Sequence, residues 1–486
     1  MNLQHLLRNV DVISTVGDCH REISSVTHDH RLVEQGCVFT CYEGVTVDGH
    51  EFISPAVQNG AEAIVGERPP PRNLPKKATY IQTTNGRAAL SLIAANWYGN
   101  PADHLKLIGI TGTNGKTSTA YLTHAIFEAA GLKSAVMGTV GHRYGDEVVP
   151  APTTTPDSLT LHGLFAQFVA TGLQYVIMET SSQGLAQYRL AGLMFETAVF
   201  TNLTQDHLDY HETMDQYLDA KAMLFRQIRR DDGLAILNAD DSASKKMRQE
   251  TGAAIQTYGL DNCADLTARD VESTLKGLAF TAVTPRGDIQ VKLRLNGDYN
   301  LYNALAAIGV AQHHECSINE IKEGLENTIV PGRFELVDRG QDFAVVVDYA
   351  HTPDGLENLL TAARRITQRR LICVFGCGGD RDRGKRPKMG RISAIIADHS
   401  VITSDNPRTE NRDRIIDDIL TGVPNGTSHD CIPDRKEAIV HAIRLAKAGD
   451  LVAIAGKGHE DYQILGDRTI YFDDREVAAE CLEHYG

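Results

Sequence analysis

The sequence contains no apolar run long enough to span a lipid bilayer, and it has little cysteine. Its first residues, MNLQHLLRNVDVIS, lack the basic segment and apolar core of a secretory signal. The nine cysteines stand apart or at CxxxC spacing, without the CxxC pairs of structural zinc sites. Idle thiols are typical of a reducing compartment, so we expect a cytoplasmic protein with no membrane insertion.

Basic residues are in the minority. The chain has 48 lysines and arginines against 63 aspartates and glutamates, a net charge of -15. Because a broad nucleic-acid surface needs the opposite sign, we expect no nucleic-acid partner. At 486 residues the chain is too long for one hydrophobic core, so several domains with clefts between them are expected. Any phosphate bound there must be held by local groups.

Glycines and prolines divide the chain into three parts, at residues 1–86, 87–333 and 334–486. The second part opens on a short apolar run, Leu105–Ile110, followed by a glycine-rich turn and a helical stretch. Strand-like and helical runs then alternate through the second and third parts, a pattern typical of parallel sheets. The predicted fold class is therefore α/β, with a small N-terminal α/β domain, a central P-loop-type, mostly parallel domain and a C-terminal Rossmann-like open domain.

The glycine-rich turn lies in GITGTNGKTST, which predicts a phosphate loop. Such a loop needs backbone N–H groups at a helix N-terminus, a lysine for the terminal phosphates and a hydroxyl for Mg²⁺. The strict pattern GxxxxGK[ST] fails, because Ile110 stands where the first glycine belongs. The strand before and the helix after still favour nucleotide binding over a random turn. The loop residues assigned to ATP are Gly112, Thr113, Asn114, Gly115, Lys116, Thr117 and Ser118.

Two further segments carry candidate metal ligands. Glu179 ends the strand-like run YVIMETSS, where a Mg²⁺-ligating carboxylate is expected opposite a phosphate loop. His207 and His211 stand four apart, a spacing that on a helix also suits zinc, although one histidine near Mg²⁺ and one structural histidine is the favoured interpretation. Lys221 lies in an ordinary helical pattern, whose simplest interpretation is a solvent-exposed lysine.

The third part places polar residues after each strand-like run. In SDNPRTEN, Pro407 predicts a stiff turn that holds Arg408 at a strand's carboxyl end, where ligands bind in open α/β sheets. By itself this arginine could equally cap a surface turn. Three other strand ends carry such residues, namely Asp348 with His351, Asp380 with Arg381, and Lys457 with Glu460. Four such ends together indicate a site.

Several motifs in this order resemble the Mur ligases, the ATP-dependent amide ligases of peptidoglycan precursor synthesis. They are TGTNGKTS, ETSSQGLAQYRL, TNLTQDHLDYHETMDQYLDAKAMLF, LYNALAA, PGRFE, VDYAHTPDGLENLL, FGCGGDRDRGKRPKMG, DNPRTE and AGKGHED. The similarity covers nearly the whole chain and is strongest to the members that add the third amino acid of the stem peptide. It implies that ATP activates a substrate carboxylate as an acyl phosphate, which an amine then attacks.

The resemblance also implies roles for the central residues. Thr117 and Glu179 would hold one Mg²⁺ and His207 a second, while Lys221 would be carbamylated and act as an anionic metal ligand. Such a modification requires a neutral amine, so positive charge near Lys221 should depress its pKa. Lys116, Glu179, His207 and Lys221 form the expected catalytic set. The positions that would reach ATP from the domain junction are Asn303, Arg333, Asp348 and His351.

The implied substrates are UDP-N-acetylmuramoyl-L-alanyl-D-glutamate and meso-diaminopimelate. Contacts to the first would come from His30, Thr154, Thr155, Ser181, Gln187 and Arg189. The chain departs from the family pattern at His30, where serine is usual, and at Thr180 and Gln183, where valine and histidine are usual. Contacts to the second would come from Arg386, Asp405, Asn406, Pro407, Arg408, Gly456 and Glu460. Arg408 would grip the carboxylate that lysine lacks, and Glu460 would face the distal ammonium.

Other functions stay open at this stage. A lysine-adding member, another Mur step or a folylpolyglutamate-type ligase shares the phosphate loop, although DNPR with KGHE favours the diaminopimelate-adding members. A nucleotide-dependent binding protein would use ATP without forming an amide. A metal-dependent hydrolase would rest on HLDYH alone. In each case a monomer is expected.

Overall fold

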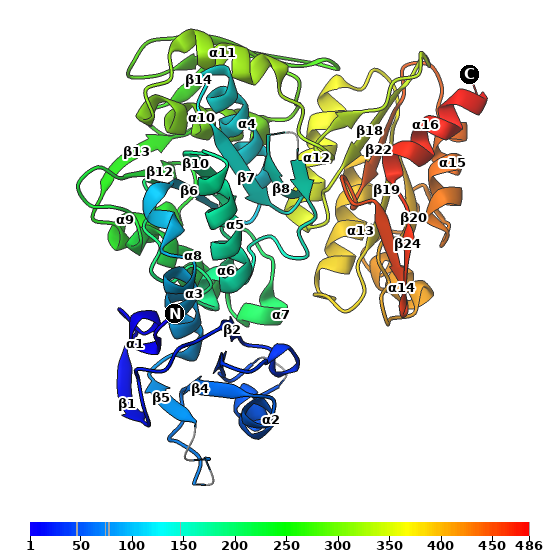
Figure 1. Ribbon diagram of the computed structural model, residues 1–486. Coiled ribbons are helices and arrows are strands. Elements are labelled where there is room, and N and C mark those ends of the chain that lie inside the picture. Colours follow the sequence, from blue (N-terminus) through cyan, green and yellow to red (C-terminus); the bar gives the residue numbers. More distant parts are fainter. Residues whose placement is uncertain (45–46, 73, 76–77, 146, 486) are drawn as a thin grey trace.

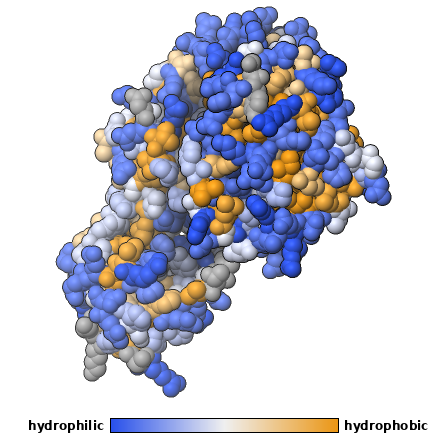
Figure 2. Space-filling view, turned by 90° about the vertical axis from the view of Figure 1, so that its right-hand side faces the viewer, coloured by the Kyte–Doolittle hydropathy of each residue, from blue (hydrophilic) through white to orange (hydrophobic). Residues whose placement is uncertain are grey.

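The computed structural model describes residues 1–44, 47–72, 74–75, 78–145 and 147–485. They form three α/β domains, as the sequence predicts (Figure 1). The N-terminal domain lies at the bottom of that view, the central domain above it and the C-terminal domain to the right. Figure 2 shows the N-terminal lobe below the rest, on a face where hydrophobic residues are scattered in small groups. None of the described helices is long and apolar enough to cross a membrane.

The N-terminal domain is a five-stranded sheet of order β1-β5-β4-β3-β2, parallel except for β1. Its elements are α1 Leu3–Leu6, β1 Val12–Val16, β2 Ser25–Thr27, β3 Cys37–Thr40, α2 Ile53–Gln58, β4 Ala61–Gly66, β5 Thr79–Thr83 and α3 Gly86–Trp97. Successive side chains of a strand point to opposite faces. Phe39 accordingly packs with α2, whereas Val38 packs with α1 and α3.

Helix α3 crosses the expected domain boundary at residue 86. Its Ala89 and Ile93 are buried in the core of the N-terminal sheet. On the other side, Ser91 Oγ donates to the backbone oxygens of Arg189 (3.2 Å) and Ala191 (2.9 Å) of the central domain. The packing of the first domain therefore extends through this helix, which composition alone assigned to the second domain.

The central domain has an eight-stranded sheet of order β13-β12-β11-β6-β10-β7-β8-β9, parallel from β13 to β7. Its elements are β6 Lys106–Thr111, α4 Lys116–Ala129, β7 Ser134–Gly138, β8 Gly141–Tyr144, β9 Glu147–Val149, α5 Ser158–Ala170, β10 Tyr175–Glu179, α6 Ser182–Ala186, β11 Thr197–Phe200, α7 Leu208–His211, α8 Met214–Arg226, β12 Leu234–Asn238, α9 Ser244–Glu250, β13 Ala254–Tyr258, β14 Thr267–Thr274, β15 Gly277–Val283, β16 Ile289–Leu293, α10 Asp298–His313 and α11 Ile318–Asn327. An antiparallel sheet, β14-β15-β16, is a feature that the sequence analysis did not anticipate.

Alternation along β6 explains why helices cover both faces of this sheet. Ile108 and Ile110 belong to the core cluster that contains α4 and α10, whereas Leu107 belongs to the cluster that contains α5 and α8. A parallel strand buried on both faces reads as a continuous apolar run, as LKLIGI does. At its carboxyl end the chain turns directly into α4, which places the predicted phosphate loop at the sheet edge.

The C-terminal domain is a six-stranded sheet of order β17-β18-β22-β19-β20-β21, parallel except for β17. Its elements are β17 Glu335–Leu336, β18 Ala344–Asp348, α12 Pro353–Ile366, β19 Leu371–Cys377, α13 Lys385–Ile396, β20 His399–Ser404, α14 Arg412–Leu420, β21 His429–Cys431, α15 Arg435–Leu445, β22 Leu451–Ala455, β23 Tyr462–Leu465, β24 Arg468–Tyr471 and α16 Asp474–Tyr485. Helices α12, α13 and α14 pack on one face, and α15 and α16 on the other.

Candidate active site

A cavity of about 980 Å³ lies between the central and C-terminal domains. Its lining brings the phosphate loop together with the residues that follow β18, β20 and β22. Of the residues assigned to ATP, a metal or a substrate, all line it except His30, Thr155, Gln187, Arg386 and Pro407, and of the other strand-end residues Asp380 and Lys457 do not line it. Strand ends far apart in the sequence thus converge on one space, as expected for the carboxyl edges of open parallel sheets.

The phosphate loop has a backbone that only glycine fits at two positions. Gly112 has φ of 153°, and a Cβ there would lie 1.8 Å from Thr201 Oγ1. Gly115 has φ of 84°, and a Cβ there would lie 2.4 Å from Asn303 Oδ1. Both neighbours are polar groups of the site itself. The loop is therefore held close to β11 and α10, and side chains are excluded from its inner surface.

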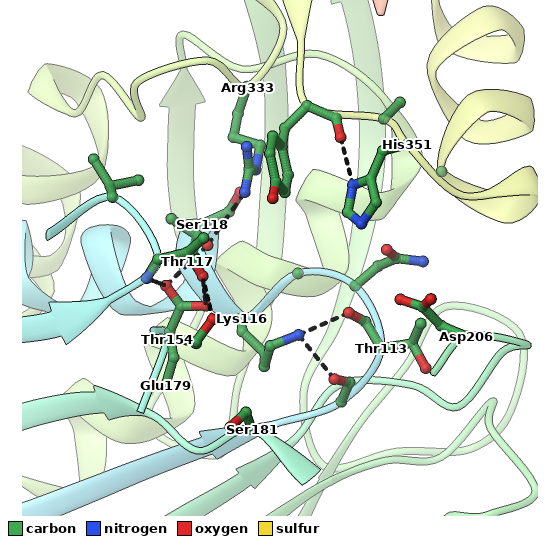
Figure 3. Close-up of a pocket in the computed structure, with 18 of the residues that line it drawn as sticks. Thr113, Lys116, Thr117, Ser118, Thr154, Glu179, Ser181, Asp206, Arg333 and His351 are labelled. Atoms are coloured by element: carbon green, nitrogen blue, oxygen red, sulfur yellow. Dashed lines mark hydrogen bonds between the residues drawn. The ribbon is translucent and has the colours of Figure 1, made fainter. Parts of the chain in front are cut away.

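Lys116 folds back over this loop, as Figure 3 shows. Its Nζ donates to the backbone oxygens of Gly112 (2.9 Å) and Thr113 (2.7 Å). Burial lowers the pKa of Lys116, while the nearby Glu179 opposes that change. The ammonium lies at the N-terminus of α4, where backbone N–H groups and the helix dipole also favour an anion.

Thr117 and Glu179 place a hydroxyl and a carboxylate beside the loop (Figure 3). Thr117 Oγ1 donates to Glu179 Oε1 at 3.0 Å, and the backbone N–H of Thr139 donates to the same oxygen at 2.9 Å. A Cβ on Gly138 would lie 2.1 Å from that oxygen, so glycine there makes room for the carboxylate. A hydroxyl and a carboxylate beside a phosphate loop are the donor set that Mg²⁺ prefers.

Lys221 is buried, so the interpretation as a solvent-exposed lysine is wrong. Its Nζ donates to the Gly112 backbone oxygen at 2.8 Å and lies 4.2 Å from the centroid of the Tyr217 ring. Burial, and after it the positive charge of Lys116, lower the pKa of Lys221 well below its ordinary value, while Asp206 opposes them. The neighbouring positive charge expected from the family resemblance is therefore present.

The two histidines of HLDYH have different hydrogen-bonding and ionic partners, although both rings lie near Tyr217. His207 has φ of 52°, and its Nε2 lies 3.5 Å from Asp206 Oδ2. His211 Nε2 instead shares a hydrogen bond with Ser182 Oγ at 2.9 Å, and burial lowers its pKa to about 4. His207 lines the cavity and His211 does not, while the place of His207 beside Mg²⁺ stays a prediction. Asp206, which the sequence analysis missed, stands directly before His207 and also lines the cavity.

Of the residues assigned to the UDP-linked substrate near the cavity, some line it and others support the lining residues from behind. Thr154, Ser181 and Arg189 line the cavity. Thr155 supports two of them from behind, since its Oγ1 accepts from the backbone N–H of Ser181 (2.9 Å) and its carbonyl accepts from Arg189 Nη1 (2.5 Å). Gln187 Oε1 likewise accepts from Arg189 Nη2 at 2.8 Å.

His30 lies in the N-terminal domain, outside the cavity. Its ring stacks on Phe52 with centroids 4.0 Å apart and planes 7° from parallel. The imidazole therefore has a rigid apolar support, which fixes the plane in which its nitrogens can form hydrogen bonds.

Four residues reach the cavity from the domain junction. The Arg333 guanidinium lies 4.5 Å from the centroid of the Tyr349 ring, and its Nη2 donates to Thr117 Oγ1 at 3.3 Å. Asp348 accepts from the backbone N–H groups of Phe334 (2.7 Å) and Ala350 (2.8 Å). Asn303 lines the loop side and His351 the opposite side, as Figure 3 shows for the latter.

A direct contact also joins the two domains across the cavity. Asn114 Nδ2 of the phosphate loop donates to Asp354 Oδ2 of α12 at 2.6 Å. Burial raises the pKa of this carboxyl. The loop and the C-terminal domain are thus in contact.

The C-terminal wall carries a network of charges. Asn406 Nδ2 donates to Glu460 Oε2 at 3.0 Å, and Lys457 Nζ donates to the same oxygen at 3.1 Å. Burial and the charge of Asp405 raise the pKa of Glu460. Gly456 has φ of 121° and approaches the Asp405 carboxylate, where a Cβ would lie 3.1 Å from Oδ2. Acidic groups therefore gather beside a buried lysine on this wall.

Arg408 follows β20 on the turn predicted from Asn-Pro-Arg. It has φ of 51°, and its Nη1 donates to the Gly379 backbone oxygen at 2.8 Å. The backbone is held separately, because Arg408 N–H donates to Ile464 O (3.2 Å) and Gly466 N–H donates to Arg408 O (2.8 Å). The guanidinium therefore lines the cavity from a loop that does not depend on the side chain.

Arg386 does not line the cavity. Its side chain is fully buried, and it pairs with Glu410 at 2.7 Å and Asp418 at 2.9 Å. These partners hold α13 against α14 and the turn before it. Arg386 also donates from Nη2 to the backbone oxygen of the cavity-lining Gly378 at 3.2 Å, and its substrate contact stays a prediction. Pro407 likewise shapes the Arg408 turn without lining the cavity.

Comparisons with known proteins agree with this architecture. Residues 22–98 match the Mur ligase family catalytic domain, residues 110–311 the Mur ligase middle domain and residues 332–458 the Mur ligase glutamate ligase domain. The chain is 43% identical to a Clostridium acetobutylicum protein and 46% identical to one from Geobacillus thermodenitrificans. In both cases 99% of each chain is covered, and both proteins are named UDP-N-acetylmuramoyl-L-alanyl-D-glutamate--2,6-diaminopimelate ligase, the first with the number 1.

Solved structures show the same fold. A structure of a UDP-N-acetylmuramoyl-L-alanyl-D-glutamate--2,6-diaminopimelate ligase superposes with a TM-score of 0.71 at 32% identity, covering 100% of this chain and 99% of the other. The MurF ligase of Thermotoga maritima in complex with ADP superposes with a TM-score of 0.62 at 17% identity, over 96% of each chain. Full-length identity above 40%, three matching domain families and the shared fold confirm the resemblance, and the chain belongs to the Mur ligase family.

Proposed function

We propose that this chain is an ATP-dependent ligase that joins meso-diaminopimelate to UDP-N-acetylmuramoyl-L-alanyl-D-glutamate through an acyl phosphate. The observation that carries the proposal is the cavity, where the phosphate loop faces Arg408, Asn406 and Glu460 of the C-terminal domain. A nucleotide site thus opens onto a pocket with both a cationic group and acidic groups. Such a pocket suits an amino acid with a carboxylate and an ammonium at its distal end.

The first step must bring two anions together. A carboxylate and a phosphate about 4 Å apart repel by about 4 kcal/mol at an effective dielectric near 20. Lys116 offsets this repulsion from the loop, and Thr117 and Glu179 are the residues that would hold Mg²⁺. Bound there, the ion would supply further positive charge at the transferring phosphoryl group. Arg333, next to Thr117, adds a cation from the domain junction.

Lys221 would act through a carbamate. Its neutral amine attacks CO₂, a proton leaves the nitrogen, and the product is an anionic carbamate. The depressed pKa of Lys221 supports this step, because an ordinary lysine with a pKa of about 10.4 is almost wholly protonated at neutral pH. The resulting oxygens would lie beside His207 and Asp206 as further ligands for a divalent cation.

Diaminopimelate selection would come from Arg408. A guanidinium binds a carboxylate through two parallel charge-assisted hydrogen bonds, which lysine cannot accept. Glu460 and Asp405 would face the ammonium at the same end. Because lysine would leave Arg408 desolvated without a partner, a site of this kind rejects the analogue by about 10⁴-fold or more. The enzyme would be cytoplasmic, because ATP is supplied in the cytoplasm, and it would act as a monomer.

The test is ligation with purified chain, ATP, Mg²⁺ and the UDP-linked dipeptide, with meso-diaminopimelate or L-lysine in parallel. Phosphate release is followed continuously, and the tripeptide product is identified by mass. We expect product with diaminopimelate alone. If product also forms with lysine, the ligase assignment stands, but the proposed role of Arg408 in amino-acid selection is wrong. The absence of any amide with either amino acid would favour a nucleotide-dependent binding protein.

A further inference from the structure

Far from this cavity, three metal-ligating side chains converge at the edge of the C-terminal sheet. His399 begins β20, Asp430 lies in the edge strand β21, and His441 lies on α15. Their ligand atoms all lie within 4.8 Å of one another. Within the part of the chain that the structure describes, this is the one group of three or more His, Cys, Asp or Glu that meets this criterion.

The register of the sheet explains why these residues meet. Asp430 pairs with Val401, so its side chain points to the same face of the sheet as Val401 and as His399, two residues earlier. Val401 belongs to the core cluster that includes Ile439 of α15. That face is therefore the one that α15 covers, and His441 extends from the same helix toward Asp430. The cluster thus follows from the fold and does not rely on a flexible loop.

The distances suit a single divalent ion. His399 Nε2 lies 3.1 Å and His441 Nε2 lies 2.7 Å from the same carboxylate oxygen, Asp430 Oδ2. Ligand atoms at about 2.0–2.1 Å around a tetrahedral zinc ion are about 3.3 Å apart, so small side-chain shifts create the site. His399 Nδ1 shares a hydrogen bond with Ser428 Oγ at 2.8 Å, the kind of outer contact that orients a ligating imidazole.

We propose that His399, Asp430 and His441 form a zinc site that fastens the edge strand β21 to β20 and α15. Two imidazoles and one carboxylate match the preferences of Zn²⁺, with water as the fourth ligand. Mg²⁺ requires oxygen ligands, so the ion of this site differs from the one that Thr117 and Glu179 would hold. Strand β21 has only three residues and one neighbour in the sheet, and a metal link would stabilise it.

The site acts on the structure and not on the reaction. His399 stands at the start of β20, whereas Asp405 of the cavity wall follows its end, and the strand between them spans about 20 Å. A metal at one end of the strand is therefore out of reach of reacting groups at the other. Removing a ligand should change zinc affinity and the stability of the domain, while ligation with Mg²⁺ continues.

The test is a calorimetric titration of Zn²⁺ into the chelator-treated full chain, in excess Mg²⁺ to occupy the oxygen-ligand site. The variants are His399→Ala, His441→Ala and the nearly isosteric Asp430→Asn. The matched control is His429→Ala, which removes an exposed imidazole from the same strand and leaves the cluster intact. We expect one equivalent of zinc in the parent and the control, weakened by about 100-fold or more in the three variants.

Thermal unfolding supplies a second measurement. Zinc should raise the unfolding temperature of the parent and the control but not of the cluster variants, and the zinc-free variants should unfold close to the zinc-free parent. If Ala variants do not fold, Asp430→Asn alone decides the question. If the parent protein binds no zinc, the cluster of His399, Asp430 and His441 contains only histidine-aspartate hydrogen bonds, and the proposal is wrong. Equal binding in parent and cluster variants, or equal loss in His429→Ala, would overturn it too.

Discussion

Replacement of Arg408 by alanine tests the proposed amino-acid pocket most directly. The loop should survive this change, because its hydrogen bonds to Ile464 and Gly466 involve only the Arg408 backbone. The φ of 51° costs alanine about as much as arginine, so backbone strain does not change either. The substitution therefore removes the guanidinium, its bond to the Gly379 carbonyl and its long bond to the Asn406 carbonyl (3.5 Å), while the backbone bonds of the loop remain.

The size of the effect follows from the lost carboxylate contact. Hydrogen bonds to charged groups contribute about 1.5–3 kcal/mol each, so a two-pronged pair contributes about 3–6 kcal/mol. At about 1.36 kcal/mol per tenfold change, kcat/KM for diaminopimelate should fall by about 10²–10⁴. Lysine has no distal carboxylate to lose, so its kcat/KM should stay level or rise. The ratio of kcat/KM for diaminopimelate to kcat/KM for lysine should therefore fall.

The assay is phosphate release at limiting amino acid, for diaminopimelate and for lysine, with product masses as confirmation. Arg408→Lys keeps the charge but loses the planar fork, and it should recover only part of the preference. Arg412→Ala is the matched control, since it removes an exposed arginine at the start of α14. An Arg408→Ala enzyme with the parent's full preference for diaminopimelate would refute the reasoning.

Four further changes test the rest of the site and its support. Lys116→Ala should abolish phosphate release without altering the circular dichroism spectrum, and near-normal turnover would contradict the ATP assignment. Lys221→Ala should be nearly inactive and regain activity with a short carboxylate such as acetate, whereas full activity without rescue would refute the carbamate. Gly112→Ala should lose ATP binding in calorimetry, because its Cβ would lie 1.8 Å from Thr201 Oγ1. Arg386→Ala should lower the free energy of unfolding by about 3 kcal/mol in urea and leave the amino-acid preference intact, since its ion pairs lie outside the cavity.

The parts of the site that sequence reasoning located are contiguous in the chain. The phosphate loop needs only a strand, a turn and a helix in succession, and Arg408 needs only a strand and a proline. The ion pairs of Arg386 could not be inferred from the sequence, because its partners, Glu410 and Asp418, stand on segments more than twenty residues away. The burial of Lys221 was likewise invisible, since the polar groups around it come from the loop and from Asp206.

In the fold, too, features set by one contiguous segment were predicted, and features set by distant segments were not. Apolar runs buried on both faces identified the parallel strands, because each run is complete in itself. Strand β16 does alternate apolar and polar residues, in IQVKL, but β14 is largely exposed and shows no such alternation, so the three-stranded sheet was not recognised. The packing of α3 could not be inferred either, because the sequence of an apolar helical face does not indicate which of two neighbouring sheets the helix covers. The boundary predicted at residue 86 precedes this helix, which packs on the first sheet through Ala89 and Ile93 and on α5 of the central domain.

Helix α3 has a practical consequence for anyone who exchanges domains among relatives. A chimera joined at residue 86 would take the sheet from one parent and the helix that completes its core from the other, and would leave mismatched side chains around Ala89 and Ile93. A junction after residue 97 keeps that core intact and leaves Ser91 to bond a foreign backbone through carbonyl oxygens, which every sequence provides. Because α3 also packs against α5 of the central domain, the side chains that meet across this pair of helices should come from one parent.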